Sequence, residues 1–335
     1  MEKTKKKSVL SLFSNQKYIV ILVVILLAAI FMIASADFRK YTTFVTLLDM
    51  SYYYVLMGIG VAFPLITGGV DLSIGTGMVC YALVGGYLVR NAGVPVIVGI
   101  LVALLFGIGI GALNGVLVAV MDLPAFLATL CTCMITRGLG SLLTFKSTVP
   151  WPTDKQPGGW FHTIFKITLA NNTKIPLGFL WVIILTIIMA FVLKHTKFGR
   201  YVIAIGSNKE ATILSGINVK FFHIMAYVVC GLFAGLAAIP YASAIPTIQP
   251  GTGAGVELDA IGGAIVGGVS ATGGSGSIEG TFFGVYVICL LKVGLPFIGL
   301  QANWQQVITG AILIGTVMID IVKKRRAVAT GQAVA

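Results

Sequence analysis

Long apolar runs alternate with short polar or glycine-rich breaks along almost the whole chain. Several runs reach the roughly 20 residues that a helix needs to cross the hydrocarbon core of a bilayer. Because the apolar residues in each run are continuous and do not alternate, the pattern indicates helices and not the strands of a barrel. We therefore predict an all-α polytopic membrane protein with about ten transmembrane helices, at residues 18–34, 51–67, 72–89, 94–120, 123–145, 175–193, 221–245, 256–270, 282–297 and 304–322.

Two of the breaks resemble each other. The letters TGG, then SI, then GT occur in this order in residues 67–76 and again in residues 272–281. Each copy lies between two apolar segments. Paired interrupted segments in the two halves of a membrane protein are typical of a transport path. The chain is therefore predicted to contain two pseudo-repeated halves whose helices are broken at these glycine-rich segments, although a chance match among 41 glycines is the alternative.

Few polar side chains lie inside the apolar regions, and these are the candidate pathway residues. Asp71 lies in the first glycine-rich break, where a charge is costly and normally faces a cavity or a partner. We expect it to be a buried cap that accepts hydrogen bonds from backbone N–H groups of residues 73–75, a structural role favoured over substrate contact. The complete set of pathway or helix-break candidates is Asp71, Ser73, Asn114, Thr129, Glu257 and Asp259.

The most polar internal stretch is residues 206–219, which lie within a central loop of residues 194–222. Residues 209–214 are predicted to form a short helix, and Gly216 is placed to end it because glycine adopts the left-handed conformation at little cost. A hydrophilic loop between membrane helices is either exposed to water or docked on a soluble partner. The two alternatives, a plain solvated loop and a docking segment, are equally compatible with the composition.

Composition and charge define the class and the orientation. Hydrophobic residues make up 57% of the 335 residues and charged residues only 10%, against about a quarter in soluble domains. Of the 23 Lys and Arg residues, 14 lie next to membrane segments, in the tail 1–17, in the central loop and at the start of the tail 323–335. By the positive-inside rule both tails and the loop are cytoplasmic, and the net charge of +12 does not indicate nucleic-acid binding. Residues 18–322 then form one membrane domain, and the loop 146–174, despite four lysines, is placed outside.

Catalytic signatures are missing from the sequence. It has no phosphate-binding loop of the GxxxxGK[ST] type, no nucleophile elbow, no dinucleotide fingerprint and no zinc-ligand spacing. The five cysteines all lie in apolar runs and are expected to be small core residues, with Cys131-Thr-Cys133 not a metal site. We predict no metal, no cofactor and no enzyme activity. A secondary carrier or facilitator for a small polar solute remains the alternative, and a membrane-embedded enzyme is strongly disfavoured.

Several motifs together carry a family resemblance. They are LITGGVDLSIG at residues 65–75, LPAFLATL at 123–130, GxNxEAxxxSGINV at 206–219 and WQQ at 304–306. The chain resembles the permease subunits of bacterial ATP-binding-cassette importers for ribose, galactose, arabinose and xylose. The likeness extends from about residue 55 to residue 326, and the spacing is most similar to the galactose/methyl-galactoside type. Ser207, Lys209 and Thr212 depart from the usual pattern, as do residues 246–250.

The resemblance implies a mechanism with separate partners. Two permease chains, expected as a homodimer, form the pore in the bacterial inner membrane; cytoplasmic ATPase subunits drive it, and an extracytoplasmic binding protein delivers the sugar. The central loop would be the coupling segment, with Glu210 and Asn208 making polar contacts to the ATPase while Ala211 and Leu214 fill an apolar groove. The ATPase-coupling residues are then Gly206, Asn208, Glu210, Ala211, Ser215 and Gly216.

Overall fold

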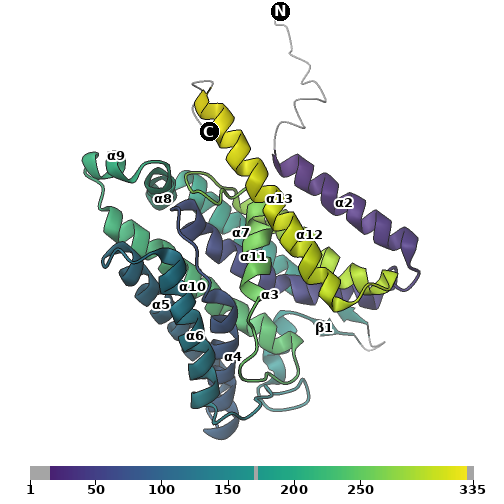
Figure 1. The fold of residues 1–335 in the computed structure, drawn as a ribbon. Helices are drawn as coiled ribbons and strands as arrows, with labels where there is room; N and C mark the ends of the chain where they lie inside the picture. The colour runs from purple at the N-terminus through teal and green to yellow at the C-terminus, as the bar shows by residue number, and fades with distance from the viewer. Residues whose placement is uncertain (1–15, 170–172, 330–335) are drawn as a thin grey trace, which may run out of the picture.

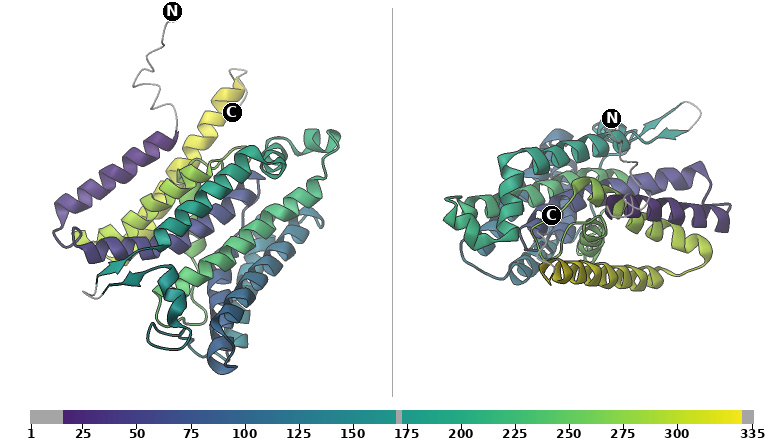
Figure 2. Two further views of the ribbon diagram at one scale, coloured as in Figure 1. Left: turned by 180° about the vertical axis from the view of Figure 1, so that it is seen from behind. Right: turned by 90° about the horizontal axis from the view of Figure 1, so that it is seen from above.

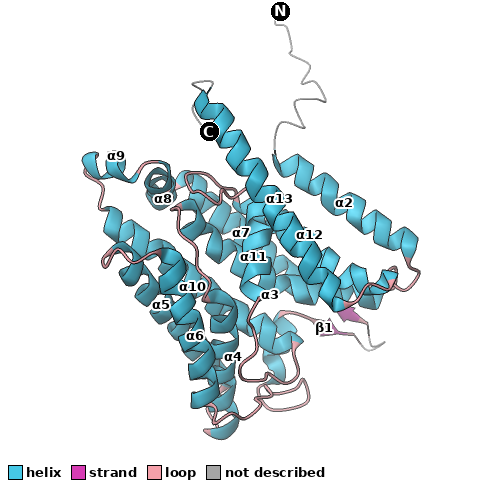
Figure 3. Cartoon of the chain, in the orientation of Figure 1, coloured by secondary structure: helices cyan, strands magenta, loops and turns pink. Residues whose placement is uncertain are grey.

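The computed structural model describes residues 16–169 and 173–329, and nearly all of the regular structure is helical (Figure 1, Figure 3). The first half contains α2 Gln16–Ala34, α3 Tyr41–Ile66, α4 Ile74–Asn91, α5 Val96–Ala119 and α6 Ala125–Leu143. The connection to the second half contains η1 Gly159–Ile164 and the short antiparallel strands β1 Ile167–Thr168 and β2 Lys174–Ile175. The second half contains α7 Gly178–His195, α8 Lys197–Ser207, α9 Lys209–Leu214, α10 Val219–Ala244, α11 Val256–Val266, α12 Ile278–Gly294, η2 Leu295–Ile298 and α13 Ala302–Ala329.

Eight helices in the described residues are long and apolar enough to cross a membrane, which confirms the predicted all-α polytopic class. Each of the ten predicted apolar runs falls on a helix. The two runs that do not belong to the eight form α4, which is rich in small and polar residues, and α11, which has only 11 residues. Gly268, with φ of 98°, follows the end of α11, so a glycine in the left-handed region accompanies this break.

The start of α3 differs from the prediction. The span was predicted to begin at residue 51, but α3 already begins at Tyr41. Val45, Leu48 and Tyr52 recur at helical spacing and are all buried in the core. One continuous apolar face therefore extends the helix beyond the purely apolar run.

Glycines let several pairs of helices touch through their backbones. At the crossing of α5 and α10, a Cβ added to Gly107 would lie 2.3 Å from the carbonyl oxygen of Gly231. At the crossing of α11 and α12, a Cβ added to Gly267 would lie 2.3 Å from the carbonyl oxygen of Gly280. Small residues at membrane-helix crossings permit this close approach. We call these two crossings the glycine seams.

The start of α2, the end of α13 and the α8–α9 segment lie at one end of the molecule, called here the α9 end (Figure 1, Figure 2). The connection between α6 and α7 lies toward the other end. The first residues of α2 and the last residues of α13 thus lie on the same side of the molecule as α8 and α9. Residues 1–15 of the predicted N-terminal tail and 330–335 of the predicted C-terminal tail lie outside the described residues.

Candidate functional site

The central loop is helical over most of its length. The predicted helix at residues 209–214 is present as α9. A second helix, α8, precedes it. Thr196 caps this helix, because its hydroxyl oxygen accepts a hydrogen bond from the Gly199 amide at 3.2 Å. On α8, Val202 and Ile205 are buried against the bundle. Residues 197–207 therefore form a helix that the sequence analysis did not predict. The cap residue and the two apolar residues three positions apart were the sequence signal for α8.

Three of the predicted coupling residues build α9 itself. The side-chain oxygen of Asn208 accepts from the Ala211 amide at 2.9 Å and caps the helix, so this oxygen is already occupied by the chain. The Ser215 hydroxyl donates to the Ala211 carbonyl at 2.9 Å. Gly216 follows the helix with φ of 75°, and its amide donates to the Ile213 carbonyl at 2.9 Å, as expected for a glycine stop.

The remaining surface of α9 is exposed and mixed in character. Glu210 and Ala211 are exposed, and the Glu210 carboxylate has no hydrogen bond or ion pair with the described residues. Ile213 is 53% exposed and Leu214 is 89% exposed. Exposed apolar side chains gathered at a polar end of a protein mark an interaction surface. We call Glu210, Ala211, Ile213 and Leu214 the α9 surface.

The end of α8 lies directly on both glycine-rich breaks. A Cβ added to Gly206 would lie 1.8 Å from the Ile66 carbonyl oxygen and 2.6 Å from the Gly274 amide nitrogen. The Gly274 amide donates to the same Ile66 oxygen at 2.9 Å. A Cβ added to Gly273 would lie 2.8 Å from the Gly68 amide nitrogen, so the two copies of the TGG motif touch each other. We call Gly68, Gly206, Gly273 and Gly274 the glycine junction.

Asp71 lies at the centre of a buried hydrogen-bond network. It is 1% exposed, and its Oδ1 accepts from the Ser73 amide at 2.8 Å and from the Ser73 hydroxyl at 2.6 Å. The Asn114 side-chain amide, from α5, donates to the two carboxylate oxygens at 3.3 and 3.4 Å and to the Ser73 hydroxyl oxygen at 2.9 Å. Asp71 therefore fixes the turn that precedes α4, and of the expected amides 73–75 only that of Ser73 bonds to it within the described chain.

Two threonines of α6 complete this network. The Thr132 hydroxyl donates to the Asn114 side-chain oxygen at 2.7 Å, and the Thr129 hydroxyl donates to the Val70 carbonyl at 3.2 Å. Four of the six predicted pathway or helix-break residues thus lie together: Asp71, Ser73, Asn114 and Thr129. Thr132 was missed, although it is the middle member of a Thr129, Thr132 and Thr136 series at helical spacing, and all three are buried.

The other two candidates, Glu257 and Asp259, lie elsewhere and point in different directions. Glu257 is buried against the N-terminal end of α4. Its Oε1 accepts a hydrogen bond from the Gly255 amide at 2.9 Å, and its Oε2 has no partner in the described residues. Asp259 forms an ion pair with Lys292 of α12 at 2.6 Å. The Tyr54 hydroxyl, at 2.9 Å from the Lys292 nitrogen, donates to the same carboxylate at 3.3 Å. Lys292 was missed, although a lone lysine inside an apolar run was a usable signal.

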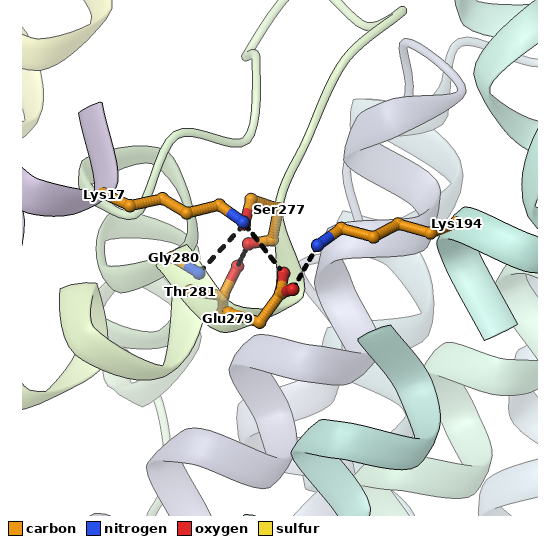
Figure 4. A network of polar contacts seen from close by, with 6 residues as sticks. All are labelled: Lys17, Lys194, Ser277, Glu279, Gly280 and Thr281. Atoms are coloured by element: carbon orange, nitrogen blue, oxygen red, sulfur yellow. Dashed lines mark hydrogen bonds and ion pairs between the residues drawn. The ribbon is translucent and has the colours of Figure 1, made fainter. Parts of the chain in front are cut away.

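A second ionic cluster, also missed, ties three helices together at the α9 end (Figure 4). Glu279, in the first turn of α12, pairs with Lys17 of α2 at 3.3 Å and with Lys194 of α7. The Ser277 hydroxyl caps α12 by accepting from the Gly280 amide at 3.0 Å and donates to Glu279 at 3.0 Å. The cluster is partly exposed, so we expect it to position the helix ends more than to stabilise the fold.

The potential metal ligands among the described residues are scattered. No group of three or more His, Cys, Asp or Glu side chains there could hold a metal ion, and all five cysteines are free. Cys80, Cys230 and Cys289 are buried core residues, as predicted. Cys131 is exposed, so the prediction is wrong for this residue; α6 buries mainly the face that carries Ala128 and Thr132.

Comparison with known proteins places the chain in a family. Residues 43–317 match the family described as branched-chain amino acid transport system / permease component. The chain belongs to this permease family. The match covers most of the membrane domain and confirms the predicted resemblance to transporter permeases. No solved structure matches the permease.

Curated relatives match this permease over nearly its whole length. It is 33% identical over 311 residues to the ribose import permease protein RbsC of Escherichia coli strain K12, covering 91% of this chain and 93% of the relative. It is 32% identical over 315 residues to the autoinducer 2 import system permease protein LsrC of Yersinia enterocolitica. This match covers 92% of this chain and 83% of the relative. The ribose import permease protein RbsC of Haemophilus influenzae is 30% identical over 301 residues. This match covers 88% of this chain and 90% of the relative. These relatives lend no support to the galactose/methyl-galactoside subtype.

Proposed function

We propose that this permease is the membrane-spanning subunit of an ATP-binding-cassette importer for a monosaccharide or a related small sugar. The observation that carries the proposal is the α9 surface, which projects from the bundle on a helix joined through the glycine junction to both helix breaks. A soluble ATPase that binds there can move α8 and, through backbone contacts, the ends of α3 and of the loop before α12. The import permeases named above support the sugar as cargo.

The proposal includes partners and a location. The α9 end faces the cytoplasm, where separate ATPase subunits bind; a sugar-binding protein docks at the opposite end; and a second copy of the permease completes the pore in the inner membrane. ATP hydrolysis occurs on the ATPase, and the permease supplies the path. Residues 194–222 act as the coupling segment, and Asp71 with its partners holds the first helix break in place.

Replacing Glu210 with alanine is expected to leave the permease folded while transport falls at least about tenfold. The exposed carboxylate has no partner in the described chain, so its loss costs within about 0.5 kcal/mol of stability, as for ordinary surface changes. A charge pair at an interface contributes more, since truncating one partner costs about 2–5 kcal/mol. Sugar uptake, permease abundance and co-purification of the ATPase measure the effect.

The control is Asp154→Ala, which removes an acid with a 64% exposed side chain at the opposite end of the molecule. This variant should co-purify with the ATPase as the wild type does. Full uptake by Glu210→Ala at normal abundance would contradict the coupling role and favour a secondary carrier without an ATPase.

The orientation can be tested by labelling introduced cysteines with a membrane-impermeant thiol reagent. Leu214 is 89% exposed at the α9 end, and Trp160 is 49% exposed on η1 in the connection between α6 and α7. Leu214→Cys should be labelled only after the cells are permeabilised, whereas Trp160→Cys should be labelled in intact cells. The reverse result would place α9 outside and exclude a cytoplasmic ATPase on it.

A further inference from the structure

A polar cavity lies among the N-terminal half of α13, the N-terminal end of α11 and the C-terminal half of α12. Its volume is about 440 Å³, within the range of roughly 300–1,000 Å³ for small-molecule pockets. Asp259, Lys292, Gln305, Gln306 and Thr309 contribute its polar side chains. Polar side chains inside membrane helices are expensive and mark solute paths. We call this space the α11–α13 cavity.

Some of these polar groups are occupied by the protein and others are not. Lys292 bonds to Asp259 and to the Tyr54 hydroxyl, and the Gln305 amide donates to the Lys292 carbonyl at 3.1 Å. The Gln306 amide and the Thr309 hydroxyl have no hydrogen-bond partner within the described part of the chain.

Thr309 is the more informative of the two free groups. It is only 6% exposed, yet its hydroxyl does not bond to the preceding turn of its helix. Thr316, two turns later on α13, shows the usual arrangement, because its hydroxyl donates to the Ile312 carbonyl at 2.9 Å. The Thr309 oxygen is not among the fully buried, unpartnered side-chain atoms of the described residues, so it is open to the cavity and free to bond to a ligand or to water.

The charges of the cavity select the chemistry of the ligand. Asp259 and Lys292 neutralise each other at 2.6 Å, so an ionic ligand would meet a like charge as well as an opposite one. A neutral molecule with several hydroxyl groups can instead donate to the carboxylate and to the side-chain oxygen of Gln306, and accept from the ammonium group and from Thr309. A lipid chain has a better site elsewhere, since the apolar groove of about 640 Å³ between α2, α3, α7 and α12 is lined almost wholly by apolar side chains.

We propose that the α11–α13 cavity is a subsite for the sugar on its way through the permease. This inference rests on the proposed function, because it takes the cargo to be a sugar. The cavity lies at the N-terminal end of α13, away from the α9 end, so it receives the sugar after the binding protein releases it. Thr309 and Gln306 recognise hydroxyl groups directly, while Tyr54 positions the Asp259–Lys292 pair.

The test is uptake by cells that carry the complete importer, measured with radiolabelled D-ribose, D-galactose, L-arabinose and D-xylose. Thr309→Val keeps the side-chain shape and removes the hydroxyl; it should lower the maximal uptake rate about five- to tenfold, as expected for one lost hydrogen bond. The half-saturating concentration should not change, because the binding protein captures the sugar first. Thr316→Val is the matched control on the same helix and should change the rate less than about twofold.

A second variant avoids the buried position. Gln306 is exposed at the rim, so Gln306→Cys should fold normally and should react with an impermeant thiol reagent from outside. Saturating transported sugar should slow that reaction at least about threefold. Equal uptake by Thr309→Val and wild type, or labelling of Gln306→Cys that the sugar does not slow, overturns the subsite. If the wild type takes up none of the four sugars, the proposed function itself fails, and the subsite fails with it.

Discussion

Gly206→Ala is expected to abolish transport, because no space exists for a methyl group at the glycine junction. The added Cβ would lie 1.8 Å from the Ile66 carbonyl oxygen and 2.6 Å from the Gly274 amide, and both are backbone atoms. Backbone cannot move aside as a side chain can, so α8 must shift away from both helix breaks. We expect a loss of about 1–3 kcal/mol in unfolding free energy, typical of overpacking, together with uptake reduced at least about tenfold.

Gly109→Ala provides the control for this prediction. Gly109 lies on α5, is exposed, and has no atom within 4 Å of an added Cβ. Alanine is the better helix former, so this variant should be neutral or slightly more stable. Thermal unfolding in detergent and uptake should be measured for both variants. Normal uptake by Gly206→Ala would show that α8 and the two breaks need not touch during transport.

Asp71→Ala is expected to have the largest effect on stability. Its carboxylate accepts hydrogen bonds from Ser73 and Asn114 in a site that is 1% exposed. Hydrogen bonds to a charged group contribute about 1.5–3 kcal/mol each, and the Ser73 amide would be left unpaired. Removing the buried charge offsets part of this loss, so we expect a net destabilisation of about 2–4 kcal/mol and a much lower yield of assembled permease.

Comparison with two other variants makes this prediction specific. Asp71→Asn keeps an oxygen that can accept from the Ser73 amide, but its new NH₂ group would face the NH₂ group of Asn114, and two donors cannot bond to each other. Its loss of stability should therefore lie between those of the wild type and Asp71→Ala. Asp37→Ala, which removes an acid with a 64% exposed side chain, should be close to wild type. A stable, fully assembled Asp71→Ala permease with altered sugar preference would show that Asp71 contacts the sugar and does not primarily hold the helix break.

The helices could be predicted from the sequence because each apolar run is long enough to specify a helix by itself. The helix ends were harder, as α3 shows: its first turns mix Tyr41, Val45 and Leu48 with polar residues, and only the position of the core decides which face is buried. The helix α9 was predictable because Asn208 and Gly216 mark its two ends locally.

The polar contacts of the site could be predicted only in part. Asp71 and Ser73 are neighbours in sequence, so their turn was foreseeable. The Lys292–Tyr54 and Lys17–Glu279 contacts join residues 238 and 262 positions apart, and no local pattern selects those partners. The TGG repeat was visible in the sequence, but the contact of its two copies with Gly206 depends on how α3, α8 and the loop before α12 pack.

The glycine seams affect how the permease can move. Where α5 meets α10 and α11 meets α12, backbone lies directly on backbone at Gly107 and Gly231 and at Gly267 and Gly280. Interlocked side chains resist sliding because they must change rotamers together. A smooth contact allows one helix to shear past its neighbour in small steps. We therefore expect the two glycine seams to act as slip planes during transport, while the ion pairs of Glu279 keep the ends of α2, α7 and α12 together.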